Sequence, residues 1–135
     1  MKQEKSFRVN IYTPYGIYVS RDADYLSVLT PKGEIGVLPG HASLISLLEI
    51  SKLVIRLSSQ EDVYAIGGGF INIKEESVVD LLVNSIEKQD EIDIDRALEA
   101  KKRAEEHLED GESDIARAKI ALAKALNRIN IYNGK

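Results

Sequence analysis

The sequence predicts a β plus α fold, in which an N-terminal antiparallel β-sandwich is followed by a C-terminal two-helix hairpin. Three observations predict it. As far as about residue 88, apolar residues alternate in short runs separated by turn signals, which is typical of half-buried strands. From Asp93 the apolar spacing changes to three and four residues, which is typical of amphipathic helices. The end of the chain is rich in alanine, a strong helix former. We therefore expect a sandwich over residues 1–88 and a helical hairpin over residues 89–135.

The strands can be placed in order along the first part. Phe7, Val9 and Ile11 fall on one face of a strand, with polar or amphipathic residues between them. A Thr-Pro-Tyr-Gly turn ends this strand. Further strands are predicted at residues 17–20, 25–30, 34–38, 51–58, 61–67, 70–74 and 77–83. Because no helix interrupts them, an antiparallel sandwich or barrel is favoured over a parallel doubly wound sheet.

The helices have recognisable ends. Asp93 is a candidate N-cap for the first helix, Gly111 is a candidate left-handed terminator, and Ser113 is a candidate cap for the second helix. The predicted apolar stripes comprise Ile94, Ala97, Leu98, Ala104 and Leu108, then Ile115, Ala118, Leu122, Ala125 and Ile129. Two such helices bury too little surface to be stable alone. The hairpin must therefore pack on the sandwich, on another chain, or on each in turn, and the third option makes it a switch.

Charge divides the hairpin. Residues 91–114 hold ten acidic and four basic residues, whereas residues 115–135 hold five basic residues and no acidic one. Folded back, the two segments attract; opened out, the second presents a basic surface. The alternative interpretation is that these charges simply keep the outer faces of the two helices solvated.

Composition excludes several classes of function. The absence of cysteine excludes disulfides, thiolate metal sites and a cysteine nucleophile, and fits a reducing compartment. A net charge of −4 gives no reason to expect nucleic-acid binding. No apolar run approaches the roughly 18 residues that span a bilayer. The start of the chain has no apolar signal-peptide core. These features predict a cytoplasmic protein that reaches a membrane only through partners.

Catalytic motifs are weak. His41 follows Pro39 and Gly40, and neither a Ser-His-Asp arrangement nor a metal-ligand spacing includes it, so we interpret it as a structural turn residue. The glycines at 67–69 are followed by a strand rather than by the helix of a phosphate-binding loop, which favours a bulge or a close backbone approach. A hydrolase that uses Asp93 and neighbouring acids is an alternative hypothesis. It requires a pocketed carboxylate of raised pKa.

Four stretches in order carry a family resemblance: GEIGVLPGH (33–41), AIGGGF (65–70), IDIDRA (92–97) and ALAKALNRI (121–129). Together they resemble the epsilon subunits of bacterial F-type ATP synthases, over essentially the whole chain. The resemblance implies the same sandwich and hairpin. It also implies a non-catalytic subunit of the central rotary stalk, which couples proton transport to ATP synthesis.

The resemblance also implies a regulatory ATP site that holds the hairpin folded. Its residues here are Glu87, Ile92, Asp93, Arg96, Ala97, Arg103, Lys124 and Arg128. In this assignment Asp93 meets the adenine amino group and Arg96 the phosphates. Lys124 stands where ATP-binding relatives carry arginine, and it lacks the bidentate fork of that residue, so weaker phosphate binding is expected. The resemblance leaves the participation of Mg²⁺ open. The alternative is that Asp93 only caps the helix and Arg96 pairs with nearby acids.

The implied partners are the gamma subunit and the ring of c subunits for the sandwich, and the alpha and beta subunits for the extended hairpin, which then inhibits ATP hydrolysis. The expected location is the cytoplasmic face of the bacterial inner membrane, as a peripheral part of the complex, and the isolated chain is expected to be a monomer. The remaining alternative is a β-sandwich interaction module whose helical tail dimerises permanently.

Overall fold

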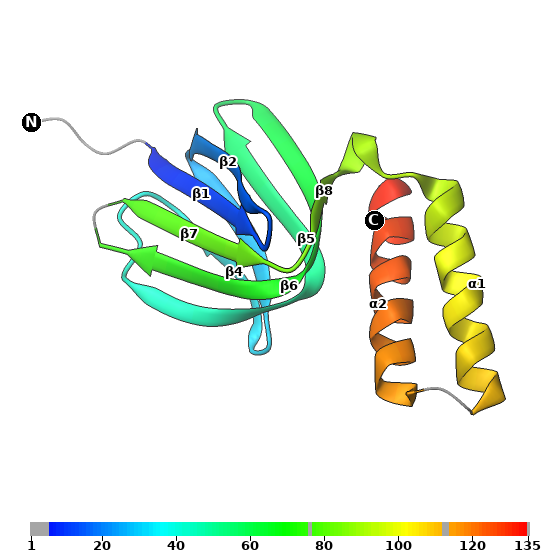
Figure 1. The fold of residues 1–135 in the computed structure, drawn as a ribbon. Helices are drawn as coiled ribbons and strands as arrows, with labels where there is room; N and C mark the ends of the chain where they lie inside the picture. Colours follow the sequence, from blue (N-terminus) through cyan, green and yellow to red (C-terminus); the bar gives the residue numbers. More distant parts are fainter. Residues whose placement is uncertain (1–5, 76, 112–113, 135) are drawn as a thin grey trace, which may run out of the picture.

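The computed structural model describes residues 6–75, 77–111 and 114–134. Within these ranges, strands come first and helices last (Figure 1). The strands are β1 (Phe7–Thr13), β2 (Gly16–Ala23), β3 (Tyr25–Thr30), β4 (Gly33–Val37), β5 (Leu44–Leu57), β6 (Gln60–Lys74), β7 (Val78–Val83) and β8 (Ile86–Lys88). A 3₁₀ turn, η1 (Gln89–Glu91), leads into α1 (Ile94–Asp110) and α2 (Ile115–Tyr132). The predicted sandwich followed by a helical hairpin is confirmed.

The strands form one folded-over sheet in the order β2-β1-β7-β6-β5-β3-β4, with β8 paired to β6. The long hairpin of β5 and β6 serves both layers: the last part of β6 pairs with β7, and its first part pairs with β8. Between the layers lies an aliphatic core that includes Phe7, Val9, Ile11, Leu26, Val28, Leu53, Ile55, Ile66, Ile71, Val79 and Leu81.

One strand pair departs from the antiparallel prediction. β1 runs parallel to β7, with Arg8 opposite Val78, whereas the other described pairs are antiparallel. About 65 residues separate these two strands, so no tight hairpin fixes their relative direction.

The glycine triplet bends β6 where it passes from β8 to β7. Gly68 and Gly69 have φ angles of +91° and +146°, and a Cβ on Gly69 would lie 2.0 Å from the carbonyl oxygen of Leu82. The close backbone approach predicted for these glycines is therefore confirmed. Because glycine here bends the strand without ending it, β6 is one strand where the sequence predicted two.

Two further differences concern strand limits. β5 starts at Leu44 rather than near residue 51, and β8 was not predicted. The apolar run 44–50 alternates poorly because side chains on both of its faces are apolar, which hides the period of two. The turn before β5 is as expected: the backbone amide of His41 donates to the carbonyl of Leu38 at 3.1 Å.

The helix ends agree in part with the prediction. Asp93 caps α1 by accepting from the amide of Arg96, and Gly111 ends α1 in the left-handed conformation with φ at +66°. Ser113, the predicted cap of α2, lies outside the described residues; the described cap is Asp114, which accepts from the amide of Arg117.

The two helices meet through alanine. The buried residues along their facing sides include Ala97 and Ala104 of α1 and Ala118 and Ala125 of α2. Leu98, placed by the sequence on the packed stripe, is 47% exposed. It is one residue, or about 100°, around the helix from Ala97, and so it lies beside the contact. Ile115 is likewise 48% exposed. The contact between the helices is therefore smaller than the predicted stripes suggested.

α2 lies between α1 and the sandwich (Figure 1). Near its end, Ile131 packs with Ile92 and with Ala65 of β6. Among the described residues, no helix combines the length and the apolarity needed to cross a membrane.

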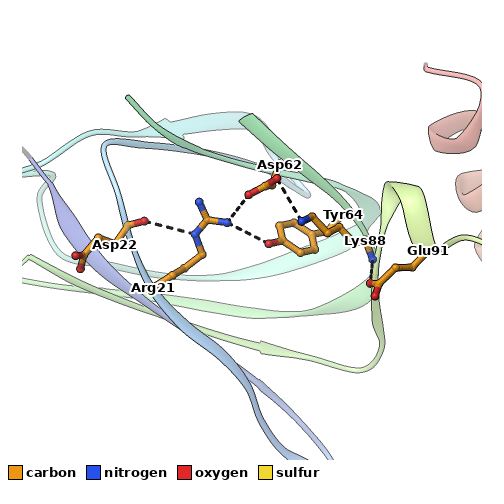
Figure 2. A network of polar contacts seen from close by, with 6 residues as sticks. All are labelled: Arg21, Asp22, Asp62, Tyr64, Lys88 and Glu91. Carbon is orange, nitrogen blue, oxygen red and sulfur yellow. Dashed lines mark hydrogen bonds and ion pairs between the residues drawn. The ribbon is translucent and has the colours of Figure 1, made fainter. Parts of the chain in front are cut away.

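A polar network fastens the last strand to the sandwich (Figure 2). The carboxylate of Asp62 in β6 accepts from Arg21 of β2 at 2.7 Å and pairs with Lys88 of β8 at 3.5 Å. Arg21 also donates to the hydroxyl of Tyr64 at 3.2 Å. The side chains of Arg21 and Asp62 are only 20% and 14% exposed. β8, which leads into the helical hairpin, is thus held to the sandwich by a network whose Arg21 and Asp62 side chains are largely buried.

We expect Asp62→Asn to lower the free energy of unfolding at pH 7 by about 2 kcal/mol, because Arg21 loses a charged partner. The hydrogen bond from Arg21, followed by the nearby charge of Lys88, holds the pKa of Asp62 below its usual value. A carboxyl with a lowered folded-state pKa stabilises the fold above its unfolded pKa of about 4, and this contribution is lost as pH falls through the folded pKa. Urea unfolding followed by circular dichroism at several pH values measures both effects.

The control for Asp62 is Asp22→Asn, which removes an exposed partner of Arg8, with side chains 51% and 56% exposed. It should cost less than about 1 kcal/mol. Equal unfolding free energies for wild type and Asp62→Asn at pH 7 would contradict the anchoring role.

Candidate functional site

A groove of about 520 Å³ lies where β8, η1 and both helices meet. It is lined by Glu87, Glu91, Asp93, Arg96, Ala97, Ala100, Arg103 and Arg128. Seven lining residues belong to 87–103 and one, Arg128, belongs to α2, so the groove is complete only while α2 is folded back beside α1. We call it the junction groove.

α1 and its N-cap supply five of the groove residues: Asp93, Arg96, Ala97, Ala100 and Arg103. Asp93 is held as the N-cap, with its carboxylate oxygen 3.1 Å from the amide nitrogen of Arg96. Arg96 and Arg103 are separated by two helical turns and lie on the same side of α1. Within the described ranges, the side chains of Arg96 and Arg103 have no ion-pair partner within 4.0 Å. The hypothesis that Arg96 pairs with neighbouring acids is therefore not supported, whereas the capping role of Asp93 is observed.

Across the groove, Arg128 of α2 forms an ion pair with Glu87 of β8. Both side chains are about one-third exposed. This pair links the second helix directly to the last strand of the sandwich. It also fixes one guanidinium across the groove from those of Arg96 and Arg103.

Glu91 lines the junction groove although the sequence did not single it out. It belongs to η1, and its carboxylate accepts from the backbone amide of Lys88 at 3.4 Å (Figure 2). The sequence did contain one signal for this role. Glu91 follows Lys88 by three residues, which is the spacing at which a glutamate reaches back to cap a turn. With Glu91 the groove holds three carboxylates and three guanidiniums.

Acidic residues also affect a neighbouring tyrosine. Burial, and then the negative charge of Glu91, raise the pKa of Tyr18 of β2. The ring of Tyr18 stands edge-on to Tyr64, with ring centroids 6.3 Å apart. Tyr18 therefore lies near the acidic residues of η1 and β8.

Two residues assigned by resemblance lie outside the groove lining. Ile92 is 6% exposed and packs with Ala65 and Ile131. Lys124 faces Gly67 and Ser85 of the sandwich. It is one helical turn, about 6 Å, from Arg128 and is thereby displaced from the end of β8.

The side chains of the groove are suited to binding a ligand that carries phosphate and amino groups. Guanidiniums bind phosphate oxygens through paired hydrogen bonds, and a carboxylate can accept from an amino group. Among the described residues, no group of three or more His, Asp or Glu side chains could hold a metal ion.

A second feature is an apolar row on the outer face of the sheet. Strand register aligns Leu47, Phe70, Leu82, Tyr12 and Ile17 across β5, β6, β7, β1 and β2. These side chains are 37–60% exposed. We call this row the outer apolar stripe. Five strands at about 4.8 Å spacing make it roughly 20 Å long. Contiguous exposed apolar surface is typical of regions that contact another protein.

Comparison with known proteins gives matches along the whole chain. The model of the ATP synthase delta/epsilon chain beta-sandwich domain matches residues 6–89, and that of the delta/epsilon long alpha-helix domain matches residues 90–133. The ATP synthase epsilon chain of Bacillus pumilus is 41% identical over 128 residues, covering 94% of this chain and 97% of the relative. That of Bacillus cytotoxicus is 38% identical over 133 residues, covering 97% and 99%.

Solved structures share the fold. A chain of the Euglena gracilis mitochondrial ATP synthase superposes with a TM-score of 0.80 at 22% identity, covering 94% of this chain and 81% of that one. A chain in the structure of the central stalk and c-ring of the Tetrahymena thermophila enzyme gives a TM-score of 0.60 at 16% identity, covering 99% and 98%.

Proposed function

The chain belongs to the family of ATP synthase delta/epsilon chains, and from this membership we propose that its helical hairpin is a nucleotide-sensitive arm that regulates ATP hydrolysis. The protein is a non-catalytic subunit of the epsilon type in the central stalk. In the proposed division of labour, residues 1–88 bind the rotor and residues 89–135 form the arm. The protein lies at the cytoplasmic face of the bacterial membrane, held there by its partners.

One observation carries the regulatory part of this proposal. Two arginines of α1, which have no ion-pair partner among the described residues, face a third arginine, on α2, across a groove that is complete only when the arm is folded. A ligand with several phosphates that bridges Arg96, Arg103 and Arg128 therefore binds the folded arm and not the extended one. ATP meets this requirement, and in the proposed site the carboxylate of Asp93 accepts from its adenine amino group. Glu87 and Ala97 also line the groove, and Ile92, next to Asp93 in the chain, packs against Ala65 and Ile131.

The energetics allow such a ligand to act as a switch. Ligand at a hundred times its dissociation constant stabilises the binding form by about 2.7 kcal/mol. Reversing a 99:1 preference requires about 5.5 kcal/mol. ATP can therefore control the arm only if the folded and extended arms are nearly balanced without it. The small alanine contact between the helices makes such a balance physically reasonable.

The outer apolar stripe supports the assembly part of the proposal. We assign it to the gamma subunit, because a rotor subunit needs a permanent contact that does not involve the movable arm. The ring of c subunits then contacts another part of the sandwich. When the arm extends, Arg117, Lys119, Lys124 and Arg128 present positive charge to acidic surface of the alpha and beta subunits, and ATP hydrolysis is inhibited.

Calorimetric titration of the isolated chain with ATP tests the ligand part. We expect saturable binding in the micromolar to millimolar range, with AMP binding at least about tenfold more weakly because it offers one phosphate instead of three. Absence of heat from ATP at millimolar concentration would remove ATP from the proposal.

Truncation after residue 88 tests the division of labour. Because β8 and its anchor on Asp62 are retained, the truncated chain should still assemble with the other rotor subunits. ATP hydrolysis by the assembled enzyme should no longer be inhibited, because the arm that inhibits it is absent. Failure of the folded, truncated chain to assemble would contradict the proposed roles of the two parts.

A further inference from the structure

α2 is attached to the sandwich mainly by polar side chains. Gln89 donates to the carbonyl oxygen of Ile131 at 2.7 Å, and Arg128 pairs with Glu87. The apolar part of the contact is small: it centres on Ile131, Ile92 and Ala65. Such a contact gains little from burial alone, so its geometry depends on how well the polar groups are matched.

Asn127 is the polar residue at the centre of this contact. Its amide nitrogen donates to the carbonyl oxygen of Ser51 at 2.9 Å and lies 3.5 Å from that of Ile66. Ser51 of β5 and Ile66 of β6 are directly opposite each other in the strand register. One side chain of α2 therefore reaches a single cross-strand pair of the sandwich.

The hydrogen bond of Asn127 also sets the position of the residues next to it on α2. Arg128, the next residue, extends into the junction groove, while Lys124 and Ile131 lie one turn to either side against the sandwich. A shift of α2 by one turn would move Arg128 by about 5.4 Å and take it away from Glu87. It would also leave the amide of Asn127 without the Ser51 carbonyl. The hydrogen bond from Asn127 to Ser51 therefore forms at one position of α2 along the sandwich and is lost when the helix shifts by a turn in either direction.

We propose that Asn127 is the positioning residue of the folded arm: by bonding the Ser51 carbonyl, it holds α2 in the one register that places Arg128 in the junction groove. This inference rests on the proposed function for its consequence in ATP binding. The attachment of α2 itself does not depend on ATP.

The test compares Asn127→Asp with Asn130→Asp in the full-length chain. Both variants make the same chemical change on α2, but Asn130 is exposed. At position 127 a carboxylate would face two carbonyl oxygens and could donate to neither. Amide exchange without nucleotide should be about twofold faster in α2 of Asn127→Asp, the limit for an arm that is nearly balanced between its two forms, with the sandwich core unchanged, and should be unaltered in Asn130→Asp. Asn127→Ala, which removes the donor without adding charge, should accelerate exchange less.

ATP titration then shows whether Asn127 acts through Arg128. Asn127→Asp should weaken ATP binding about tenfold in the wild-type background and should have no further effect in the Arg128→Ala background, because the residue to be positioned is then absent. A purely structural role would give the same loss in both backgrounds and would overturn the inference.

The two proposals can fail separately. If wild type binds no ATP, the ligand part of the proposed function is wrong, and amide exchange without nucleotide still decides whether Asn127 attaches α2. If α2 of Asn127→Asp and Asn127→Ala exchanges at the wild-type rate, the positioning role is wrong, whatever the ATP affinity.

Discussion

Replacing Phe70 by glutamate should abolish stable association with the gamma subunit while leaving the isolated chain folded. Phe70 is at the centre of the outer apolar stripe, between Leu47 and Leu82 in the strand register. It is 51% exposed, so the sandwich core does not depend on it. In an assembled interface the introduced carboxylate would be buried without a partner. Central aromatic residues of interfaces contribute about 2–4 kcal/mol or more, so we expect a loss of affinity of roughly 30- to 1,000-fold.

Ile120→Glu is the matched control for this substitution. Ile120 is also 51% exposed and apolar, but it lies on α2, which the proposal treats as dispensable for assembly. Co-purification with tagged gamma subunit, together with circular dichroism of each variant, measures the effect. Normal assembly by Phe70→Glu would show that the stripe is not the rotor contact.

Arg96→Ala should weaken ATP binding by roughly 10- to 150-fold, equivalent to about 1.5–3 kcal/mol for hydrogen bonds to a charged group. Because the guanidinium of Arg96 has no ion-pair partner in the described part of the chain, its removal should leave the unfolding free energy within about 0.5 kcal/mol. Lys102→Ala removes the same charge from an exposed position of α1 outside the groove and should have little effect.

Arg128→Ala provides a contrast within the same groove. It removes a phosphate ligand and also the ion pair with Glu87, so it should weaken both ATP binding and the docking of α2. Calorimetry of the variants measures the affinities. If Arg96→Ala and Lys102→Ala bound ATP equally well, general attraction between charges would explain binding, and the groove would not be the site.

The helical part could be predicted closely because its signals are local. Asp93 caps the helix through the amide of Arg96, three residues away, and Gly111 supplies the left-handed conformation itself. The rotation of the helices about their own axes was less predictable. Alanine and leucine are both apolar, and the sequence did not show that the close contact would select Ala97 and leave Leu98 exposed.

The sandwich was predicted as a class, but not in its connections. Pairing of β1 with β7 and anchoring of Lys88 on Asp62 bring together residues far apart in sequence, and no local pattern encodes such contacts. The same limit applies to the junction groove. The grouping of Asp93, Arg96 and Arg103 follows from helix spacing, whereas the turning of Lys124 toward Gly67 depends on how α2 docks.

The central claim is that the arm is only weakly held on the sandwich and that ATP selects its folded form. Because the chain contains no cysteine, Ser59→Cys and Lys119→Cys give one dye on the exposed β5–β6 turn and one on an exposed position of α2. Fluorescence energy transfer between them then reports the distance from the sandwich to the arm. Extension of both helices would move the arm by roughly 50 Å at most.

Without ATP, the doubly labelled chain should show a broad distribution of transfer efficiencies, and saturating ATP should narrow it to high efficiency. Mixtures of singly labelled chains should show no transfer. Transfer in such mixtures would instead indicate a permanent dimer of arms, which is the competing hypothesis. An identical, narrow distribution with and without ATP, in a sample shown by calorimetry to bind ATP, would contradict the claim.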